Sequence, residues 1–325
     1  MNHSILVLGG AHLDRRGQIS GRTFPGASNP GRFTEEAGGG GFNAARNLAR
    51  LGHEVAMIAP RGGDQAGETV RVAAEEAGVA YVPLTFLDRV TPSYTAILEA
   101  DGNLVIAVAD MDLYRQFTPR RLRARTVRNA MNKATALICD ANLSAETLQA
   151  LSGEASTRQI PLYAIAISPA KVERFRGCLG GLTTLFMNEA EAEVVAGQKP
   201  TDPHHWPELL RNAGLNGGVV TRGDREAIAF NPREVAVLAP PRLKEIADVT
   251  GAGDSFASGF ISASLSGATT TEALRHATAA AIITLRSPQA ASSALSTVSL
   301  HRTLQEVPVA TQVLNPENDI RQAYP

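Results

Sequence analysis

The chemistry-bearing feature with the most specific spacing is the stretch D-V-T-G-A-G-D at residues 248–254, which leads directly into an amphipathic helical pattern. Backbone N–H groups of Gly251, Ala252 and Gly253 can converge there at a helix N-terminus, where the helix dipole favours an anion such as a phosphoryl group. Asp254 would lie beside this anion hole and could accept the proton of an attacking hydroxyl. An isolated G-x-G-D is more simply explained as a turn before an acidic first helical turn, so this interpretation depends on the other motifs.

A run of four glycines, residues 38–41, opens a second helical pattern and is followed by Phe42 and Asn43. Glycine is entropically costly in such numbers, so we expect the backbone to approach a ligand closely here. A polyol is a suitable ligand, and the Asn43 amide could bind it. A flexible hinge or a plain helix entry explains the run equally well in isolation.

Two further polar motifs follow apolar runs. Asn188 and Glu191 stand three residues apart at a predicted helix start, where they could hold a magnesium-bound water near ATP phosphates. An N-cap with a capping glutamate is the commoner meaning of such a pair. Thr221 and Gly223 end another run, where a hydroxyl and an N–H could contact phosphate or where the chain simply turns.

The elements that would position these motifs alternate regularly along the chain. Short aliphatic runs, typical of buried strands, occur at residues 5–8, 55–59, 136–138, 162–167, 183–187 and 218–221. Helical patterns occur at residues 43–51, 67–77, 144–151, 189–196, 206–213, 254–265 and 271–285. The alternation predicts an α/β fold, with a doubly wound, mostly parallel sheet flanked by helices. We expect residues 1–325 to form a single domain.

Two segments do not fit this alternation. Residues 17–34 have no helical period, and residues 93–108 contain two alternating runs joined by Asp101-Gly102, a hairpin signal. We expect a small β-lid, formed by residues 15–36 and 91–112, over the molecule that carries the attacking hydroxyl, here called the acceptor. Because such a sheet exposes an edge or a face, we also expect a homodimer through the lid.

Composition excludes several function classes. The 31 lysines and arginines balance 32 acidic residues, which argues against nucleic acid or an anionic membrane as partner. Cys139 and Cys178 lack the spacing of a zinc or redox motif and are expected to be reduced. The first apolar run has no basic leader before it, which favours a cytoplasmic enzyme. The glycines after that run do not form G-x-G-x-x-G, which disfavours a dinucleotide-binding oxidoreductase.

In their order along the chain, these motifs resemble the PfkB or ribokinase-like family of carbohydrate kinases. The family's N-terminal signature is similar to A-G-G-G-G-F-N-A-A-R-N-L-A-R-L-G at residues 37–52 and G-G-D-x-x-G at residues 62–67, and its C-terminal signature is similar to D-V-T-G-A-G-D. The resemblance covers nearly the whole chain. It implies a ribokinase-like fold and an ATP- and Mg²⁺-dependent kinase for a sugar or nucleoside hydroxyl.

The resemblance also implies roles for individual residues. Asp254 would be the catalytic base, and Gly251, Ala252 and Gly253 the anion hole. The ATP contacts would be Asn188, Thr221, Gly223, Gly251 and Gly253. Glu191 would hold Mg²⁺ through water, and Asp248 and Thr250 would hold a monovalent cation such as K⁺. The acceptor contacts would be Asp14, Gly39, Gly40, Asn43, Ser93, Asp112 and Asn142.

Within the family, short stretches are most similar to pseudouridine kinases: S-N-P-G at residues 28–31, V-A-D-M-D at residues 108–112 and C-D-A-N-L-S at residues 139–144. They favour pseudouridine as acceptor, phosphorylated at its 5'-hydroxyl. Asp14 and Asn43 could bind the ribose hydroxyls, while Ser93, Asp112 and Asn142 contact the base. A ribose, a fructose derivative or another nucleoside are the alternative acceptors.

Two positions depart from the family pattern. Ile165 stands where relatives often carry an aspartate, and Glu226 stands where the last glycine of T-x-G-x-x-G is expected. A carboxylate near nucleotide phosphates would repel them unless it points away. These departures leave open a ligand-binding protein that kept the fold and lost the chemistry, although Asp254 and its glycines argue against it.

Overall fold

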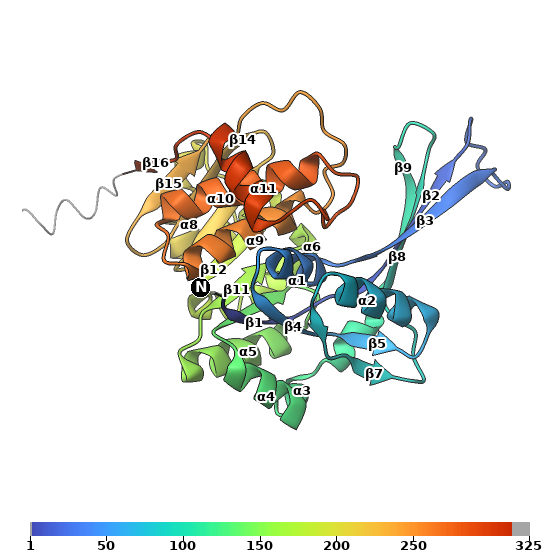
Figure 1. The fold of residues 1–325 in the computed structure, drawn as a ribbon, viewed down its shortest axis with the longest axis horizontal. Coiled ribbons are helices and arrows are strands. Elements are labelled where there is room, and N and C mark those ends of the chain that lie inside the picture. Colours follow the sequence, from blue (N-terminus) through green and yellow to red (C-terminus); the bar gives the residue numbers. More distant parts are fainter. Residues whose placement is uncertain (1, 314–325) are drawn as a thin grey trace, which may run out of the picture.

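A ten-stranded sheet runs through the centre of the protein in the computed structural model, which describes residues 2–313 (Figure 1). Its spatial order is β16-β15-β14-β13-β12-β11-β10-β1-β4-β6. The strands are β1 (Ser4–Leu8), β4 (Glu54–Ile58), β6 (Ala80–Tyr81), β10 (Ala136–Asp140), β11 (Leu162–Ile165), β12 (Thr184–Asn188), β13 (Gly218–Arg222), β14 (Arg225–Phe230), β15 (Val235–Leu238) and β16 (Thr311–Val313).

The strands from β6 to β13 are parallel to one another, and β14, β15 and β16 extend the sheet in antiparallel fashion. This confirms the predicted mostly parallel sheet. Strand β10 is buried along its whole length, as expected for a strand covered by helices on both faces. Because parallel strands end at the same edge, the motifs after β1, β10, β11 and β12 meet at one edge of the sheet. The antiparallel strands were not predicted.

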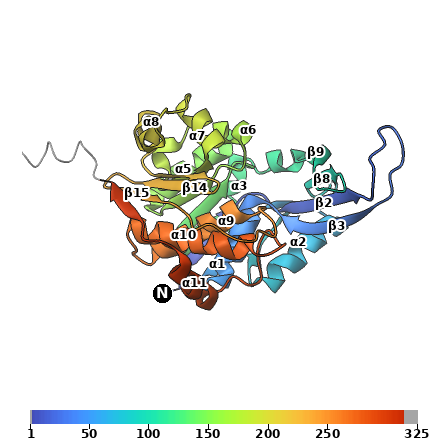
Figure 2. The same cartoon turned by 90° about the horizontal axis from the view of Figure 1, so that it is seen from above.

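Two helical layers cover the sheet, one on each face (Figure 2). One layer contains α1 (Gly40–Arg50), α2 (Gln65–Glu76), α9 (Ala252–Leu265), α10 (Thr270–Leu285) and α11 (Thr297–Thr303). The other contains α3 (Pro119–Leu122), α4 (Arg125–Lys133), α5 (Ala145–Arg158), α6 (Pro169–Val172), α7 (Glu189–Ala196) and α8 (Trp206–Asn212). Each layer encloses its own apolar core, so the fold is doubly wound as predicted.

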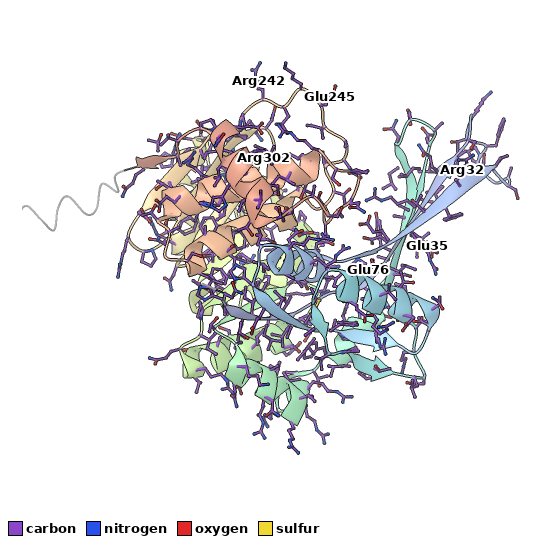
Figure 3. All side chains as sticks on the ribbon, viewed as in Figure 1. Arg32, Glu35, Glu76, Arg242, Glu245 and Arg302 are labelled. Atoms are coloured by element: carbon purple, nitrogen blue, oxygen red, sulfur yellow. The ribbon has the colours of Figure 1, made fainter. Side chains whose placement is uncertain are left out.

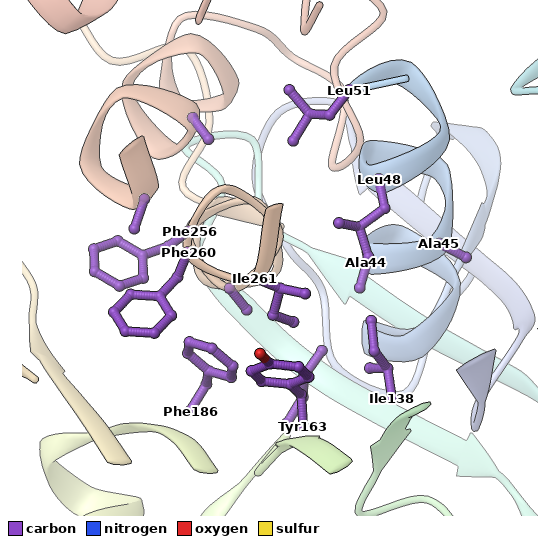
Figure 4. Packing of buried hydrophobic residues seen from close by; sticks show 14 of the residues in the cluster. Ala44, Ala45, Leu48, Leu51, Ile138, Tyr163, Phe186, Phe256, Phe260 and Ile261 are labelled. Atoms are coloured by element: carbon purple, nitrogen blue, oxygen red, sulfur yellow. The ribbon is translucent and has the colours of Figure 1, made fainter. Parts of the chain in front are cut away.

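Helices α1 and α9 pack side by side, and this contact brings the two glycine-rich motifs together. Ala44 and Leu48 of α1 lie beside Ile261 of α9, with Ile138 and Tyr163 of the sheet beneath them (Figure 4). Small side chains such as alanine allow the two helices to approach closely. Both helices begin at the carboxyl edge of the parallel strands, so their N-termini are neighbours.

A second, four-stranded sheet, here called the lid, projects from the main body (Figure 1). Its order is β3-β2-β8-β9, with β2 (His12–Ile19), β3 (Gly31–Gly38), β8 (Ser93–Leu98) and β9 (Leu104–Asp110). The two predicted lid segments therefore pair as expected, through β2 and β8. A short two-stranded sheet, β5 (Pro60–Gly62) and β7 (Leu84–Phe86), lies near α2.

Cys139 and Cys178 are free and buried, in agreement with the prediction of reduced, structural thiols. Among residues 2–313, none of the helices combines the length and apolar character needed to cross a bilayer.

Candidate active site

The candidate anion hole is the N-terminus of α9. Gly251 precedes the helix with a positive φ of 74°, and a Cβ there would collide with the carbonyl of Ala290. Glycine is therefore required both by conformation and by space. The N–H of Ala252 donates to Val249 O at 3.3 Å, and the following first-turn N–H groups have no acceptor within the helix. No side chain caps this end of α9, which leaves these N–H groups available to an anion.

Asp254 lies in the first turn of α9, beside these N–H groups, and is half-buried. The side-chain Nδ2 of Asn43 donates to its Oδ2 at 2.8 Å. Burial raises the pKa of Asp254 to about 7, and the charges of Asp140 and Glu191 act in the same direction, while the Asn43 hydrogen bond and Arg46 oppose them. A carboxylate with this pKa is well matched to accept a proton near neutral pH.

The glycine run that opens α1 allows several groups to approach the backbone. A Cβ on Gly38 would collide with Asp14, and one on Gly39, whose φ is 111°, would collide with the carbonyl of Gly10. A Cβ on Gly40 would lie 3.2 Å from Asp254 Oδ1, and one on Gly41 would lie 2.8 Å from an oxygen of Asp140. The run therefore gathers three carboxylates around one helix N-terminus, which explains its need for glycine.

Asp140, at the carboxyl end of β10, organises this region and was not among the predicted residues. It is fully buried. Its Oδ2 accepts the N–H groups of Gly10 and Gly41, each at 2.8 Å, and its Oδ1 accepts the N–H of Asn142 at 2.8 Å. The carboxylate thereby joins the loops after β1 and β10 to the start of α1. Its position as the first polar residue after the apolar run at residues 136–139 is the signal that could have identified it.

The predicted acceptor residue Asp14 lies at the base of the lid. Nε2 of His12 is 3.2 Å from its Oδ1, and Nδ1 of His12 is 2.9 Å from the hydroxyl of Tyr114. Burial, reinforced by the negative charge of Asp140, raises the pKa of Tyr114 well above its ordinary value. The chain of contacts places Asp14, His12 and the neutral Tyr114 hydroxyl along one side of the candidate acceptor site.

The structure does not bring all the predicted acceptor residues together. Asn43 is buried, and both its side-chain groups are engaged, because Arg46 Nη2 donates to its Oδ1 at 2.7 Å and its Nδ2 binds Asp254. Ser93 pairs with Leu13, so the alternation along the lid strands places Ser93 on the face opposite to Asp14. Tyr94, which pairs with Asp14, lies on the same face as Asp14. Gly40 lies beside Asp254, and Gly39 lies against Gly10 and His12.

Asn142 lies in a cavity of about 360 Å³ between the base of the lid and helices α5 and α6. Lys171 Nζ donates to Asn142 Oδ1 at 2.7 Å, while the buried Asn142 Nδ2 has no partner and lies against Gly10. Burial lowers the pKa of Lys171. Lys171 was not among the residues predicted from the sequence. Asp112 also lines this cavity, but it is at the exposed rim, 3.5 Å from Arg115.

The residues that were expected to contact ATP also take part in ordinary secondary structure. Asn188 and Glu191 make a reciprocal capping box on α7: Asn188 Oδ1 accepts the N–H of Glu191 at 3.0 Å, and Glu191 Oε2 accepts the N–H of Asn188 at 2.7 Å. Burial raises the pKa of Glu191. The hydroxyl of Thr221 donates to Met187 O at 3.3 Å, and Gly223 has a φ of 69° in the exposed turn after β13.

The residues expected to hold cations fit that role unequally. Across residues 2–313, no three His, Cys, Asp or Glu side chains gather as a metal site. Mg²⁺ would therefore depend on Glu191 and on nucleotide phosphates, which is a common arrangement for this ion. Asp248 and Thr250 do not fit a monovalent cation, because Arg16 of the lid contacts the side chains of both, at 3.0 and 3.1 Å.

The two departures from the family pattern lie in different surroundings. Ile165 ends β11 and lies with Ile167 against Gly40, so both form an apolar wall near Asp254. Ile167 has a φ of 69°, a rare and strained conformation for a β-branched residue, which nothing in the sequence indicated. The Glu226 carboxylate lies 3.7 Å from His204 Nε2 on the 3₁₀ helix Pro203–His205.

Relatives of the chain are carbohydrate and nucleoside kinases. The family model for pfkB family carbohydrate kinase matches residues 2–297. The chain is 29% identical over 289 residues to the Escherichia coli protein named uncharacterized sugar kinase YeiI, which covers 86% of this chain and 77% of that one. It is 26% identical over 278 residues to Escherichia coli pseudouridine kinase, which covers 84% of this chain and 87% of that one.

Solved structures agree with this relationship. A carbohydrate kinase from Agrobacterium tumefaciens is 58% identical, with a TM-score of 0.88 over 95% of this chain and 99% of that one. Arabidopsis thaliana ribokinase, solved with ribose and ATP, shares the fold at 19% identity, with a TM-score of 0.83 over 94% of this chain and 99% of that one. The predicted ribokinase-like fold is confirmed. The chain belongs to the pfkB family of carbohydrate kinases and is a phosphotransferase with an alcohol group as acceptor.

Proposed function

We propose that the protein transfers the γ-phosphoryl group of ATP to the 5'-hydroxyl of a nucleoside, and that this nucleoside is pseudouridine. ATP as donor is supported by the family and by the uncapped N-terminus of α9. The acceptor is supported mainly by one observation: Asn142, whose buried Nδ2 has no partner, and the half-buried Lys171, whose Nζ donates to Asn142 Oδ1, line one cavity.

In the proposed reaction, Asp254 accepts the proton of the attacking hydroxyl. The phosphoryl group lies at the N-terminus of α9, where the N–H groups of residues 251–253 stabilise the charge that develops on its oxygens. Ile165 and Ile167 exclude water from one side of Asp254, which favours proton transfer from the acceptor over solvent. Asn43 orients the carboxylate through its hydrogen bond and acts as a positioning residue.

The polar groups that line the Asn142 cavity favour a pyrimidine dione. Donors such as Asn142 Nδ2 and Lys171 Nζ bind carbonyl oxygens, of which uracil has two, whereas the amino groups of adenine or cytosine would oppose them. Pseudouridine differs from uridine by an additional ring N–H at its C-linked edge. The Asp112 carboxylate on the cavity rim offers an acceptor for that N–H. A bare sugar, which has no base, would leave the buried Asn142 Nδ2 without a partner, at a cost of about 1–3 kcal/mol.

Mg²⁺ is proposed to bind the ATP phosphates near Glu191. Glu191 Oε2 already accepts the N–H of Asn188, so the remaining oxygen would reach the ion through water. The ion would neutralise charge on the phosphates during transfer. Asn188, Thr221 and Gly223 are proposed to contact the nucleotide at the same edge of the sheet.

The specificity constant measured by coupled ADP release tests this proposal. We expect the specificity constant for pseudouridine to exceed those for uridine, adenosine, ribose and fructose 6-phosphate under identical ATP and magnesium concentrations. The preference for pseudouridine over uridine should be about five- to hundredfold. A preference for uridine or ribose would overturn the acceptor assignment and leave the kinase intact. ADP release with none of the acceptors would instead favour a ligand-binding protein.

We also propose that the lid mediates a homodimer. Phe33, Ile97 and Ile106 lie in one row of the lid sheet, with the Phe33 ring over Gly17, on the face opposite to Asp14. The side chains of Phe33 and Ile106 are 65% and 60% exposed, and the lid stands apart from the helical layers, as Figure 3 shows around Arg32 on β3. Exposed apolar rows on a sheet face favour self-association.

Light scattering at micromolar concentration checks the dimer. Wild-type protein should have twice the chain mass, and Phe33→Ser with Ile106→Ser should have the monomer mass. Val298→Ser, which removes a 71% exposed side chain from α11, is the matched control and should stay dimeric. A monomeric, fully active wild-type protein would rule out the lid dimer.

A further inference from the structure

The lid arginine Arg16 contacts the segment that leads into the anion hole. Its Nη1 donates to Asp248 Oδ2 at 3.0 Å and its Nη2 donates to Thr250 Oγ1 at 3.1 Å. The other oxygen of Asp248, Oδ1, accepts both the backbone N–H and the hydroxyl of Thr250, each at 2.8 Å. The oxygens of these two side chains are therefore engaged by protein groups, and the guanidinium supplies the positive charge.

The loop that packs against Gly251 is held in a similar way. The Ala290 carbonyl lies where a Cβ of Gly251 would be, and the next two carbonyls, of Ala291 and Ser292, accept from Arg50 Nη1 at 2.8 and 3.0 Å. Carbonyl oxygens are typical ligands of alkali cations in proteins. A cation placed between these segments would compete with two guanidinium groups and would be repelled by both.

We propose that Arg16 takes the place of a monovalent cation in this protein, so that phosphoryl transfer does not depend on K⁺. The guanidinium holds residues 248–250 and, through them, the conformation of Gly251 at which α9 begins. Arg16 acts through these residues and is a positioning residue. The proposal rests on the phosphotransfer reaction of the family and not on the identity of the acceptor.

The location of Arg16 on the lid gives the contact a second consequence. Arg16 follows Asp14 by two residues on β2, so both side chains lie on the same face of the lid. An acceptor that binds Asp14 would therefore also act on the Arg16–Asp248 contact, which is already formed in this structure. The anion hole and the acceptor site are coupled through one strand, a connection that a free cation could not provide.

The experiment compares wild type, Arg16→Met and Arg15→Met in sodium, potassium or tetramethylammonium chloride at equal ionic strength, with the acceptor that the panel identifies. Wild-type turnover should change less than about twofold between salts. Arg16→Met should lose about ten- to hundredfold in kcat, with little change in KM for ATP, because the anion hole is misaligned. Potassium or guanidinium should restore part of that loss. Potassium should also raise the melting temperature of Arg16→Met and not that of wild type.

Arg15 is the matched control, since it is the neighbouring lid arginine on the opposite face and pairs with Glu35 at 2.9 Å. Arg15→Met should behave as wild type in every salt. If Arg16→Met does not fold, Arg16→Lys, which keeps the charge and cannot bridge both oxygens, is measured instead. Severalfold stimulation of wild type by potassium would overturn the proposal. So would an unchanged kcat in Arg16→Met, or a loss that no cation restores.

Discussion

The region around Asp254 and the lid are built in contrasting ways. Asp140 is buried and binds three backbone N–H groups, two of them from segments distant in sequence, and Asp254 is held by Asn43 from another helix. The lid has an exposed outer face with Phe33 and is connected to the main body by polar contacts such as that of Arg16 with Asp248. We infer from the difference that the candidate reacting groups are fixed before substrates bind, whereas closure of the lid depends on a few polar contacts at its base.

The largest expected effect comes from closing the space at Gly251. Gly251→Ala should lower kcat by about a hundredfold or more. The added Cβ collides with the Ala290 carbonyl, and the positive φ at this position is unfavourable for alanine. Gly153→Ala on α5 is the matched control, since nothing lies within 4 Å of a Cβ there. Steady-state kinetics and melting temperatures distinguish the two. Equal kcat values would show that the start of α9 is not a rigid part of the site.

Asp254 should also lower the free energy of unfolding at neutral and higher pH, where its carboxylate is ionised. Its pKa is about 7 in the folded protein and about 3.8 in the unfolded chain, so folding favours the protonated form. Its unfavourable contribution therefore grows as pH rises from 3.8 to 7. Asp254→Asn should raise the free energy of unfolding by about 1–3 kcal/mol at pH 8 and by much less at pH 5. Denaturant titrations at both pH values check this, and equal differences would contradict the raised pKa.

A smaller effect is expected in the acceptor cavity. Lys171→Met removes the charged donor beside Asn142 and should lower kcat/KM for pseudouridine by about tenfold, with a much smaller loss for ribose. Lys133→Met, on the exposed end of α4, should leave both values unchanged. Equal losses for pseudouridine and ribose would indicate that Lys171 does not face the base.

The smallest expected effect concerns the apolar wall of Asp254. Ile167→Ala should admit water beside the carboxylate, because the Ile167 side chain lies against Gly40 and near Asp254. The pKa of Asp254 should then fall, and the pH dependence of kcat/KM, which should rise through about pH 7 in wild type, should move to lower pH by less than about one unit. A profile that stays in place or moves upward would contradict burial as the main cause.

The sequence predicted the core of the molecule more fully than the connections between its parts. Each aliphatic run and each glycine motif is contained in a few consecutive residues. The parallel strands and the helices α1 and α9 could therefore be predicted from the sequence. Asp140 was missed because two of its three partners, Gly10 and Gly41, are distant in sequence and meet it only through the fold. The antiparallel strands β14 and β15 were missed although turn residues at Gly223 and at Asn231-Pro232 flank β14, because a short apolar run does not by itself distinguish a strand from other buried segments.

The lid shows where residue-by-residue prediction failed. Its pairing followed from the hairpin signal, but the strand register decides which face each residue occupies. That register separates Ser93 from Asp14 and places Arg16 on Asp248. A one-residue shift would reverse both outcomes, and apolar residues occupy both faces of β8 and β9, so the sequence pattern does not define the register. The expectation that Asp248 and Thr250 bind a cation came from the family resemblance, which does not show that Arg16 of the lid reaches their side chains.

The central claim is that Asp254 is the general base, and turnover by Asp254→Asn tests it most directly. The amide keeps the shape of the side chain and cannot accept the proton, so kcat should fall by about a hundredfold or more while ATP affinity stays within about twofold of wild type. Wild-type melting behaviour, or higher stability at pH 8, would show that the variant is folded. Unchanged turnover in that folded variant would contradict the claim and remove Asp254 from the mechanism.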